Sequence, residues 1–222
     1  MSKVRIKEIF SSIQGEGPYI GYKQLFIRFC NCNLKCNYCD TDFSSNEDFI
    51  EHNPKSLIDE VNKYNDIHSI SLTGGEPLLS VEFLKEFLPL VDKKVYLETN
   101  ATLTDKFLEI KPYINIVSAD IKLESSTGIK DTFRLHDKFF EACNGIESFA
   151  KIVFNEKISE NEINQCCALG NKYGIELILQ PEMINDTMSV TSEFAEIILN
   201  MFLEKYDRVR LIPQMHKFMN LR

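Results

Sequence analysis

Three cysteines lie within one short stretch of this 222-residue chain, Cys32-Asn33-Leu34-Lys35-Cys36-Asn37-Tyr38-Cys39. The stretch has little apolar periodicity, so it predicts a loop rather than a helix or a strand. Such a loop can turn three thiolates towards one metal cluster, and a 4Fe–4S cube normally takes four cysteine thiolates. If no fourth cysteine arrives from elsewhere, one iron keeps an open position, which suits catalysis better than electron transfer alone.

The same three cysteines could instead hold a structural zinc ion, with a histidine as the fourth ligand. The nearest histidine, His52, lies thirteen residues beyond Cys39, and the sequence has no second Cys-x-x-Cys. The spacing therefore favours an iron–sulfur cluster, with zinc or free thiols as the alternatives. We expect the other cysteines to be small buried hydrophobic residues: Cys30, Cys143, Cys166 and Cys167.

Composition narrows the class of protein. The net charge is −8 and the sequence has no basic stripe, which argues against a nucleic-acid surface. No apolar run reaches membrane-spanning length, and the N-terminal residues do not resemble a signal peptide. Seven unevenly clustered cysteines do not resemble a secreted disulfide framework. We therefore expect a cytoplasmic protein with no membrane contact and a single domain over residues 1–222.

Strand and helix patterns alternate along most of the chain. Strands are predicted at 4–10, 24–30, 69–72, 94–100, 113–119, 149–154, 175–179 and 208–212. Helices are predicted at 55–64, 81–91, 105–111, 137–143, 160–173 and 190–206, with irregular segments at 42–53 and 124–134. This alternation predicts a parallel sheet with helices outside it. Because no dinucleotide-binding Gly-x-Gly-x-x-Gly is present, we favour a partial, open α/β barrel over a doubly wound sheet.

Several candidate ligand contacts fall at the carboxyl ends of the predicted strands, where α/β barrels bind their ligands. The sequence Thr-Gly-Gly-Glu-Pro at 73–77 follows one strand directly, and its two glycines would let a ligand approach the backbone. Asn100, Ser118 and Gln180 follow three other strands. Glu98, at the end of its strand, either faces the ligand or supports the next turn. These positions predict one shared site.

Two further candidates lie near the N-terminus. The loop around Gln14 and Glu16 has two glycines and a proline, and it either approaches a ligand or forms a plain turn. Arg28 lies inside a predicted strand, between Ile27 and Phe29, so it is a cation that needs an anion if both faces are covered. The anion is either a structural Asp or Glu, or a substrate carboxylate held by the two-pronged guanidinium.

Taken together, these motifs resemble a known family. Cys-x3-Cys-x2-Cys, with Gly-Gly-Glu-Pro about thirty-five residues beyond it, resembles the radical S-adenosylmethionine (SAM) superfamily. Other motifs resemble the 7-carboxy-7-deazaguanine synthase family over almost the whole chain: Phe-x-Ser-Ile-Gln-Gly-Glu-Gly, Phe-Ile-Arg-Phe, Cys-Asn-Tyr-Cys-Asp-Thr, Thr-Gly-Gly-Glu-Pro and Pro-Gln-Met-His-Lys.

The resemblance implies a radical ring contraction of 6-carboxy-5,6,7,8-tetrahydropterin to 7-carboxy-7-deazaguanine, with release of ammonia, in queuosine and 7-deazapurine biosynthesis. The cofactors it implies are a 4Fe–4S cluster, SAM and Mg²⁺, and the partners are an electron donor such as a flavodoxin or ferredoxin and a second copy in a homodimer. The alternatives are a glycyl-radical-enzyme activase, another radical-SAM enzyme or a non-catalytic metal-binding module. A ligand-approach loop such as Gly-Gly-Glu-Pro argues against the last of these.

The resemblance also implies roles for individual residues. Cys32, Cys36 and Cys39 would ligate the cluster, and Thr41 would bind Mg²⁺, which prefers oxygen ligands. Contacts to SAM would come from Tyr38, Asp40, Gly75, Asn100, Ser118, Ala119 and Asp120. Contacts to the pterin would come from Ile13, Gln14, Gly15, Glu16, Thr73, His216, the terminal carboxylate of Arg222, and Arg28 holding the substrate carboxylate. The family often has glycine near the end, where this chain has Met219-Asn220. No general base is assigned.

Overall fold

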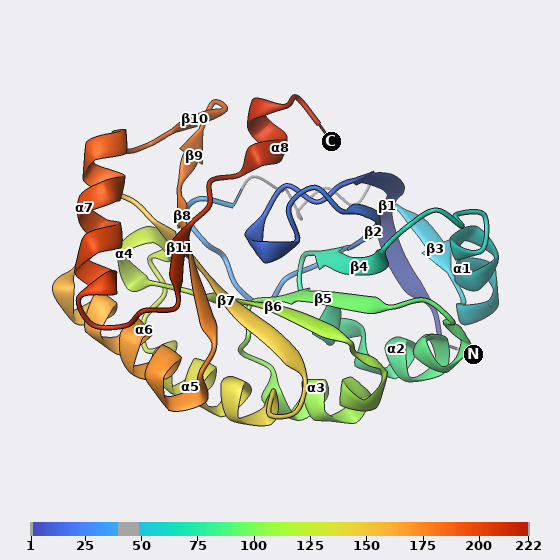
Figure 1. Ribbon diagram of the computed structural model, residues 1–222. Helices are drawn as coiled ribbons and strands as arrows, with labels where there is room; N and C mark the ends of the chain where they lie inside the picture. Colours follow the sequence, from blue (N-terminus) through green and yellow to red (C-terminus); the bar gives the residue numbers. More distant parts are fainter. Residues whose placement is uncertain (1, 40–48, 222) are drawn as a thin grey trace.

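The computed structural model describes residues 2–39 and 49–221. Within this part, nine strands form one curved sheet in the order β11-β8-β7-β6-β5-β4-β2-β1-β3 (Figure 1). Their bounds are β1 (Val4–Ile13), β2 (Lys23–Phe29), β3 (Ile50–His52), β4 (Ser69–Gly74), β5 (Val95–Thr99), β6 (Ile116–Ile121), β7 (Glu147–Phe154), β8 (Glu176–Pro181) and β11 (Val209–Leu211). A separate two-stranded hairpin joins β9 (Met183–Ile184) and β10 (Thr187–Met188).

Within the nine-stranded sheet, the pairings from β2 across to β11 are parallel, whereas β1 runs antiparallel to both β2 and β3. From β4 to β8 the order across the sheet follows the order along the chain, as successive strand–helix–strand crossovers produce. The outermost strands β11 and β3 do not pair with each other in the described sheet, so the barrel remains open. The predicted open α/β barrel is therefore confirmed.

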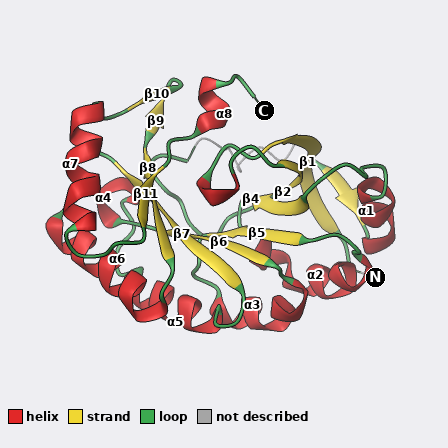
Figure 2. Ribbon diagram, viewed as in Figure 1, coloured by secondary structure: helices red, strands yellow, loops and turns green. Residues whose placement is uncertain are grey.

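Most of the helices cover the outer face of this sheet, whereas the last one, near the C-terminus, lies away from that face (Figure 2). Their bounds are α1 (Pro54–Val61), α2 (Val81–Phe87), α3 (Thr104–Ile110), α4 (Glu124–Thr127), α5 (Phe133–Ala142), α6 (Glu160–Tyr173), α7 (Ser192–Leu203) and α8 (Met215–Phe218). The predicted helix at 160–173 matches α6, because Ser159 and Glu162 form a capping box at its start and Gly174 ends it in the left-handed conformation. The main apolar core fills the space between sheet and helices.

A smaller aromatic cluster fills the inner face of the barrel. It joins Tyr96, Ile116, Phe149 and Ile178 from the N-terminal halves of four strands, and Tyr19 packs against it. Tyr19 belongs to a short 3₁₀ turn, Gly17–Tyr19, on the inner side of the strands in Figure 1. The cluster closes this end of the barrel, which leaves the opposite end, at the carboxyl ends of the strands, for ligands.

Some sequence predictions were wrong. The segment 42–53, predicted to be irregular, contains β3, whose three residues pair with the sheet edge and are too few to show alternation. The segment 124–134 contains α4, and α5 begins at Phe133 rather than 137. Of the four cysteines expected to be buried, three are and Cys30 is partly exposed. No helix of the described residues is both long enough and apolar enough to cross a membrane.

Candidate active site

Two neighbouring cavities lie at the carboxyl ends of the parallel strands. The larger one, about 230 Å³, is called here the large cavity, and the smaller one, about 110 Å³, the cysteine cavity. The cysteine cavity is lined by all three cysteines of the loop at 32–39. The two cavities share wall residues, so they form adjoining parts of one site: Tyr38, Cys39, Thr73, Gly74, Glu98 and Asp120.

The structure brings most of the predicted site residues to these two cavities. The large cavity is lined by Ile13, Gln14, Gly15, Glu16, Arg28, Thr73 and His216. The cysteine cavity is lined by Cys32, Cys36, Cys39, Gly75 and Asn100, and Tyr38 and Asp120 line both. Ser118 and Ala119 are buried in β6 and line neither cavity. Asp40, Thr41 and Arg222 lie outside the described residues.

The Gly-Gly turn after β4 lets the cysteine loop approach closely. Gly74 has a φ of +101°, in the region that favours glycine. A Cβ atom on Gly75 would lie 1.8 Å from the carbonyl oxygen of Asn31, so no side chain fits there. The backbone N–H of Glu76 donates to that same carbonyl at 2.9 Å. The turn therefore fixes the backbone that leads into the cysteine loop.

Glu76 ties the turn to the end of β5. Its fully buried carboxylate accepts hydrogen bonds from the backbone N–H groups of Leu78 and Asn100 and from the Thr99 hydroxyl. Burial raises the Glu76 pKa to about 7, although these donors act in the opposite direction. The Asn100 amide in turn donates to the Asn33 side chain at 2.9 Å and lies 3.8 Å from the Cys32 sulfur. Through these contacts, two strand ends support the cysteine loop.

The donor set in the cysteine cavity fits an iron–sulfur cluster. Cys32, Cys36 and Cys39 are free thiols, and burial, together with the nearby Asp120, Cys32 and Cys39, raises the Cys36 pKa despite an opposing effect of Lys122. Among residues 2–39 and 49–221, no three His, Cys, Asp or Glu side chains are grouped to hold a single metal ion. A cluster binds its thiolates through different iron atoms, so its ligands need not converge on one point. Three thiols that line one cavity are therefore a donor set that suits a cluster.

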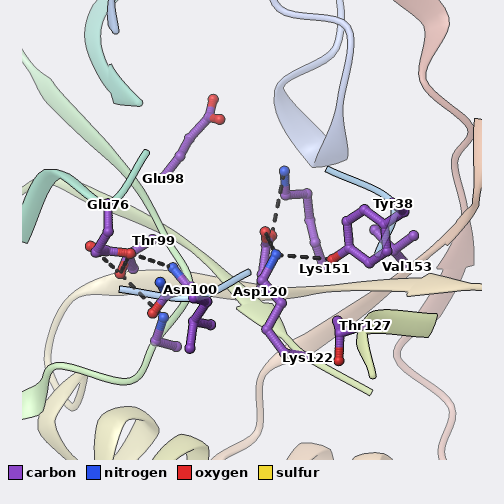
Figure 3. A network of polar contacts seen from close by, with 12 residues as sticks. Tyr38, Glu76, Glu98, Thr99, Asn100, Asp120, Lys122, Thr127, Lys151 and Val153 are labelled. Atoms are coloured by element: carbon purple, nitrogen blue, oxygen red, sulfur yellow. Dashed lines mark hydrogen bonds and ion pairs between the residues drawn. The ribbon is translucent and has the colours of Figure 1, made fainter. Parts of the chain in front are cut away.

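A row of alternating charges runs between the two cavities (Figure 3). Lys122 donates to the Tyr38 hydroxyl at 3.0 Å and to Asp120 at 2.8 Å. Lys151 lies 3.4 Å from the other Asp120 oxygen and 2.5 Å from Glu16. Burial alone would raise the Asp120 and Glu16 pKa values, but the lysines outweigh it: the Asp120 pKa is lowered, and that of Glu16 falls to about 2. Both carboxylates are therefore ionised at neutral pH.

A second polar group lines the large cavity around Glu98. Its carboxylate accepts hydrogen bonds from Thr73 at 2.8 Å, Ser71 at 3.1 Å and the Gln14 amide at 3.1 Å. The Gln14 amide also donates to Gln24, so both of its hydrogens are used inside the protein. Gln14 therefore fixes the loop and Glu98, and the Glu98 carboxylate is the acceptor at the cavity wall.

Arg28 has a protein partner and also lines the large cavity. Its guanidinium lies 2.8 Å from the Glu8 carboxylate and 5.1 Å from the centre of the Phe10 ring. The Arg28 side chain is 36% exposed, which leaves donor atoms free to reach a ligand. Phe10 stacks on Phe26 with ring centres 5.3 Å apart, and both rings line the cavity. The wall thus combines a cation with a flat apolar surface.

The C-terminal segment covers the loop at 14–16. The N–H of Met215 donates to the Gly15 carbonyl at 2.9 Å, and a Cβ atom on Gly15 would lie 2.5 Å from the His216 Cβ. Gln214 donates to the Glu16 carboxylate at 2.7 Å, and the His216 ring is 4.0 Å from it. Glycine at position 15 therefore permits α8 to close over the site.

Comparisons with known proteins identify the family. Residues 26–154 match the model of the Radical SAM superfamily. The 7-carboxy-7-deazaguanine synthase of Geobacter sulfurreducens is 36% identical over 99% of both chains, and that of Archaeoglobus fulgidus is 32% identical over 99% of this chain and 100% of its own. The chain belongs to the 7-carboxy-7-deazaguanine synthase family. It is thus a radical SAM enzyme, and that superfamily uses a 4Fe–4S cluster and SAM.

Solved structures agree on the fold. QueE from Escherichia coli aligns with a TM-score of 0.64 at 17% identity, covering 96% of this chain and 95% of its own. A radical SAM methyltransferase from Sphaerobacter thermophilus aligns with the same TM-score of 0.64 at 9% identity, covering 86% and 66%. At these identities the likeness concerns the fold alone, which supports the radical SAM barrel found here.

Some residues of the site are not indicated by the sequence alone. Lys151 lies inside the apolar strand β7, and it was overlooked although the same signal had singled out Arg28. Lys122 follows directly after β6, and its pairing with Tyr38 depends on a contact across 84 residues. For Glu98 the sequence leaves open a ligand contact or support of the next turn, and the structure places its carboxylate on the wall of both cavities.

Proposed function

We propose that this chain converts 6-carboxy-5,6,7,8-tetrahydropterin to 7-carboxy-7-deazaguanine and ammonia. The observation that carries the proposal is that Arg28 and the carboxylates Glu16 and Glu98 line one cavity, which adjoins the cavity of the three cysteines. A carboxylated pterin offers the complementary groups, because it has an anionic carboxylate, hydrogen-bond donors on its pyrimidine ring and a flat ring system.

The cysteine cavity would hold the cofactors. Cys32, Cys36 and Cys39 would ligate three irons of the cluster, and the fourth iron would bind SAM. When bound, the cluster and SAM would supply the radical that removes a hydrogen atom from the pterin. Gly75 and Asp120 would contact SAM, since both line this cavity beside the cysteines. The inferred contacts also include Tyr38, Asn100, Ser118, Ala119 and Asp40.

The large cavity would hold the pterin. Arg28 would bind the substrate carboxylate with the guanidinium atoms that Glu8 does not occupy. Glu98 and Glu16 would accept hydrogen bonds from N–H groups of the pterin, because both carboxylates face the cavity as acceptors. His216 would close the site from α8. We extend this set to Ile13, Gln14, Gly15, Thr73 and the terminal carboxylate of Arg222.

The chain's own residues would orient the substrate and exclude water from it. α8 and the loop at 14–16 lie over the cavity, and the aromatic cluster closes the opposite end of the barrel. A carboxylate held by Arg28 would fix the reacting ring relative to the cysteine cavity, and such positioning accounts for much of the rate that an enzyme provides. No residue is assigned as a general base.

We further propose the finer features that the family implies. Mg²⁺ would bind beside the substrate carboxylate with Thr41 as an oxygen ligand. A flavodoxin or ferredoxin would deliver the electron, two copies would form a homodimer, and the enzyme would work in the cytoplasm as one domain. What supports these proposals is the family resemblance of the sequence.

The proposed contact between Arg28 and the substrate carboxylate gives a direct test of the substrate assignment. The reconstituted enzyme is assayed anaerobically with the carboxylated pterin, as wild type, as Arg28→Ala and as the control Arg210→Ala. Arg210, on β11, pairs with Glu176 of β8 and lines neither cavity. Loss of a charged hydrogen bond corresponds to a decrease of about 10-fold to 100-fold in kcat/KM for Arg28→Ala. The assignment is wrong if Arg28→Ala and Arg210→Ala turn over the pterin equally well.

A further inference from the structure

Lys151 is a buried cation at the centre of the site. Its side chain is 8% exposed, and its neighbours in β7, Ala150 and Ile152, are fully buried. Its ammonium group contacts two carboxylates, Glu16 at 2.5 Å and Asp120 at 3.4 Å. A buried charge is costly unless it is paired with good geometry, so these contacts specify where all three side chains lie.

The two carboxylates come from different elements of the site: both line the large cavity, and Asp120 also lines the cysteine cavity. Glu16 lies in the loop at 14–16 and also accepts a hydrogen bond from Gln214 beneath α8. Asp120 lies near the end of β6, beside the cysteine cavity, and it also accepts a hydrogen bond from Lys122, which donates to Tyr38 in the cysteine loop. Lys151 therefore connects the wall of the large cavity with the wall of the cysteine cavity, as Figure 3 shows for the Asp120 side.

The charges around Lys151 make this link necessary. Four carboxylates line one cavity of about 230 Å³: Glu16, Glu98, Asp120 and Glu182. Without Lys151, the partners that the described part of the chain leaves to the Glu16 carboxylate are the Gln214 amide and the more distant His216. Like charges in one small cavity repel each other, so the loop at 14–16 would move away from β6.

We infer that Lys151 is a positioning residue that holds Glu16 and Asp120 at a fixed separation and so aligns the pterin with SAM. This inference rests on the function proposed above, since it takes Glu16 to face the pterin and Asp120 to face SAM. Lys151 itself lines the large cavity, and its ammonium group there is engaged by the Glu16 and Asp120 carboxylates. It acts through the two carboxylates, and it therefore affects the binding of both ligands at once.

The test compares ligand binding by the cluster-reconstituted wild type and the Lys151→Met variant. Methionine keeps the length of the chain and removes its charge. Isothermal titration calorimetry gives the affinity for SAM and, separately, for the pterin. Each affinity is expected to fall about 10-fold to 100-fold, the usual effect of losing a buried charged hydrogen bond. Lys172→Met is the matched control, because Lys172 forms an exposed ion pair with Asp137 on the outer helices.

A double-mutant cycle separates positioning from general damage to the fold. Asp120 lines both cavities, so Asp120→Asn is expected to weaken pterin binding in the wild type; if this effect passes through Lys151, it is much smaller in Lys151→Met. SAM cleavage without product should also increase in Lys151→Met, because a misaligned pterin intercepts fewer radicals. Circular dichroism and thermal melting confirm that the variants fold.

The two possible failures can be told apart. If the wild type binds the pterin and Lys151→Met binds both ligands as tightly, or if the Asp120→Asn effect is the same in both backgrounds, the inference about Lys151 is overturned alone. If the wild type itself does not bind the pterin, the proposed function fails and this inference fails with it.

Discussion

Glu76 gives a prediction about stability that depends on pH. Its carboxyl group is fully buried, and burial raises its pKa from 4.5 to about 7. Between these two pH values, the folded protein keeps a proton on Glu76 that the unfolded chain has released. The contribution of Glu76 to stability is therefore fully present below pH 4.5 and is lost as the pH rises through 7. A difference of about 2.5 pKa units corresponds to about 3 kcal/mol.

A second buried group has the opposite pH dependence. His136 in α5 is fully buried, and its Nε2 accepts a hydrogen bond from the Lys122 N–H. Burial lowers the His136 pKa from 6.5 to about 4. The contribution of His136 to the stability of the fold, again about 3 kcal/mol, is therefore present above pH 6.5 and is lost as the pH falls through 4. The two effects nearly cancel, so the wild-type profile alone does not reveal Glu76.

The difference in the free energy of unfolding between wild type and Glu76→Gln isolates the contribution of Glu76. Glutamine places an N–H group among three donors, so the variant is expected to be less stable by about 2–5 kcal/mol at pH 5. Because glutamine does not titrate, this deficit should shrink by about 3 kcal/mol between pH 4.5 and 7.5. Urea unfolding of both proteins over that pH range measures how this deficit in stability changes. A deficit that grows with pH would refute the reasoning, because it would mean that the hydrogen bonds outweigh burial and lower the pKa.

Two further predictions concern the cysteine loop. Gly75→Ala should cost at least about 1–3 kcal/mol and impair cluster binding, since its Cβ atom would lie 1.8 Å from the Asn31 carbonyl oxygen. Gly145→Ala is the control, because a Cβ atom there meets nothing within 4 Å; its positive φ alone should cost about 1 kcal/mol of stability. Equal losses of stability for Gly75→Ala and Gly145→Ala in urea unfolding would contradict the steric argument. Cys36→Ala should lose the iron–sulfur absorbance after anaerobic reconstitution, whereas Cys167→Ala, whose cysteine is buried in α6, should keep it. If Cys36→Ala keeps this absorbance, Cys36 is not a cluster ligand.

Much of the fold could be predicted because its signals are local. The capping box at Ser159 and the glycine at 174 mark the ends of α6 in the sequence itself. The apolar strand before Thr73 leads directly into the paired glycines, and parallel strands must place such ends together. The cysteine spacing pointed to the cluster loop without any knowledge of the fold.

The rest of the site depends on contacts between distant parts of the chain. Lys151 and Glu16 are 135 residues apart, and no local pattern reveals that their charges meet. Arg28 illustrates a second limit, because the sequence allowed a protein partner or a ligand, and the structure shows Glu8 on one side and the cavity on the other. His136 is a third case: it is buried in α5, and its ring accepts a hydrogen bond from the backbone N–H of Lys122 after β6, a contact that no local pattern indicates.

The central claim is that the large cavity binds a carboxylated pterin beside a radical-generating cofactor site. Mass spectrometry of an anaerobic reaction tests it most directly, with reconstituted enzyme, reductant, SAM, Mg²⁺ and 6-carboxy-5,6,7,8-tetrahydropterin. The account predicts that 7-carboxy-7-deazaguanine and ammonia accumulate in equal amounts. If SAM is cleaved while the pterin stays intact, the radical SAM chemistry stands and the substrate assignment is contradicted.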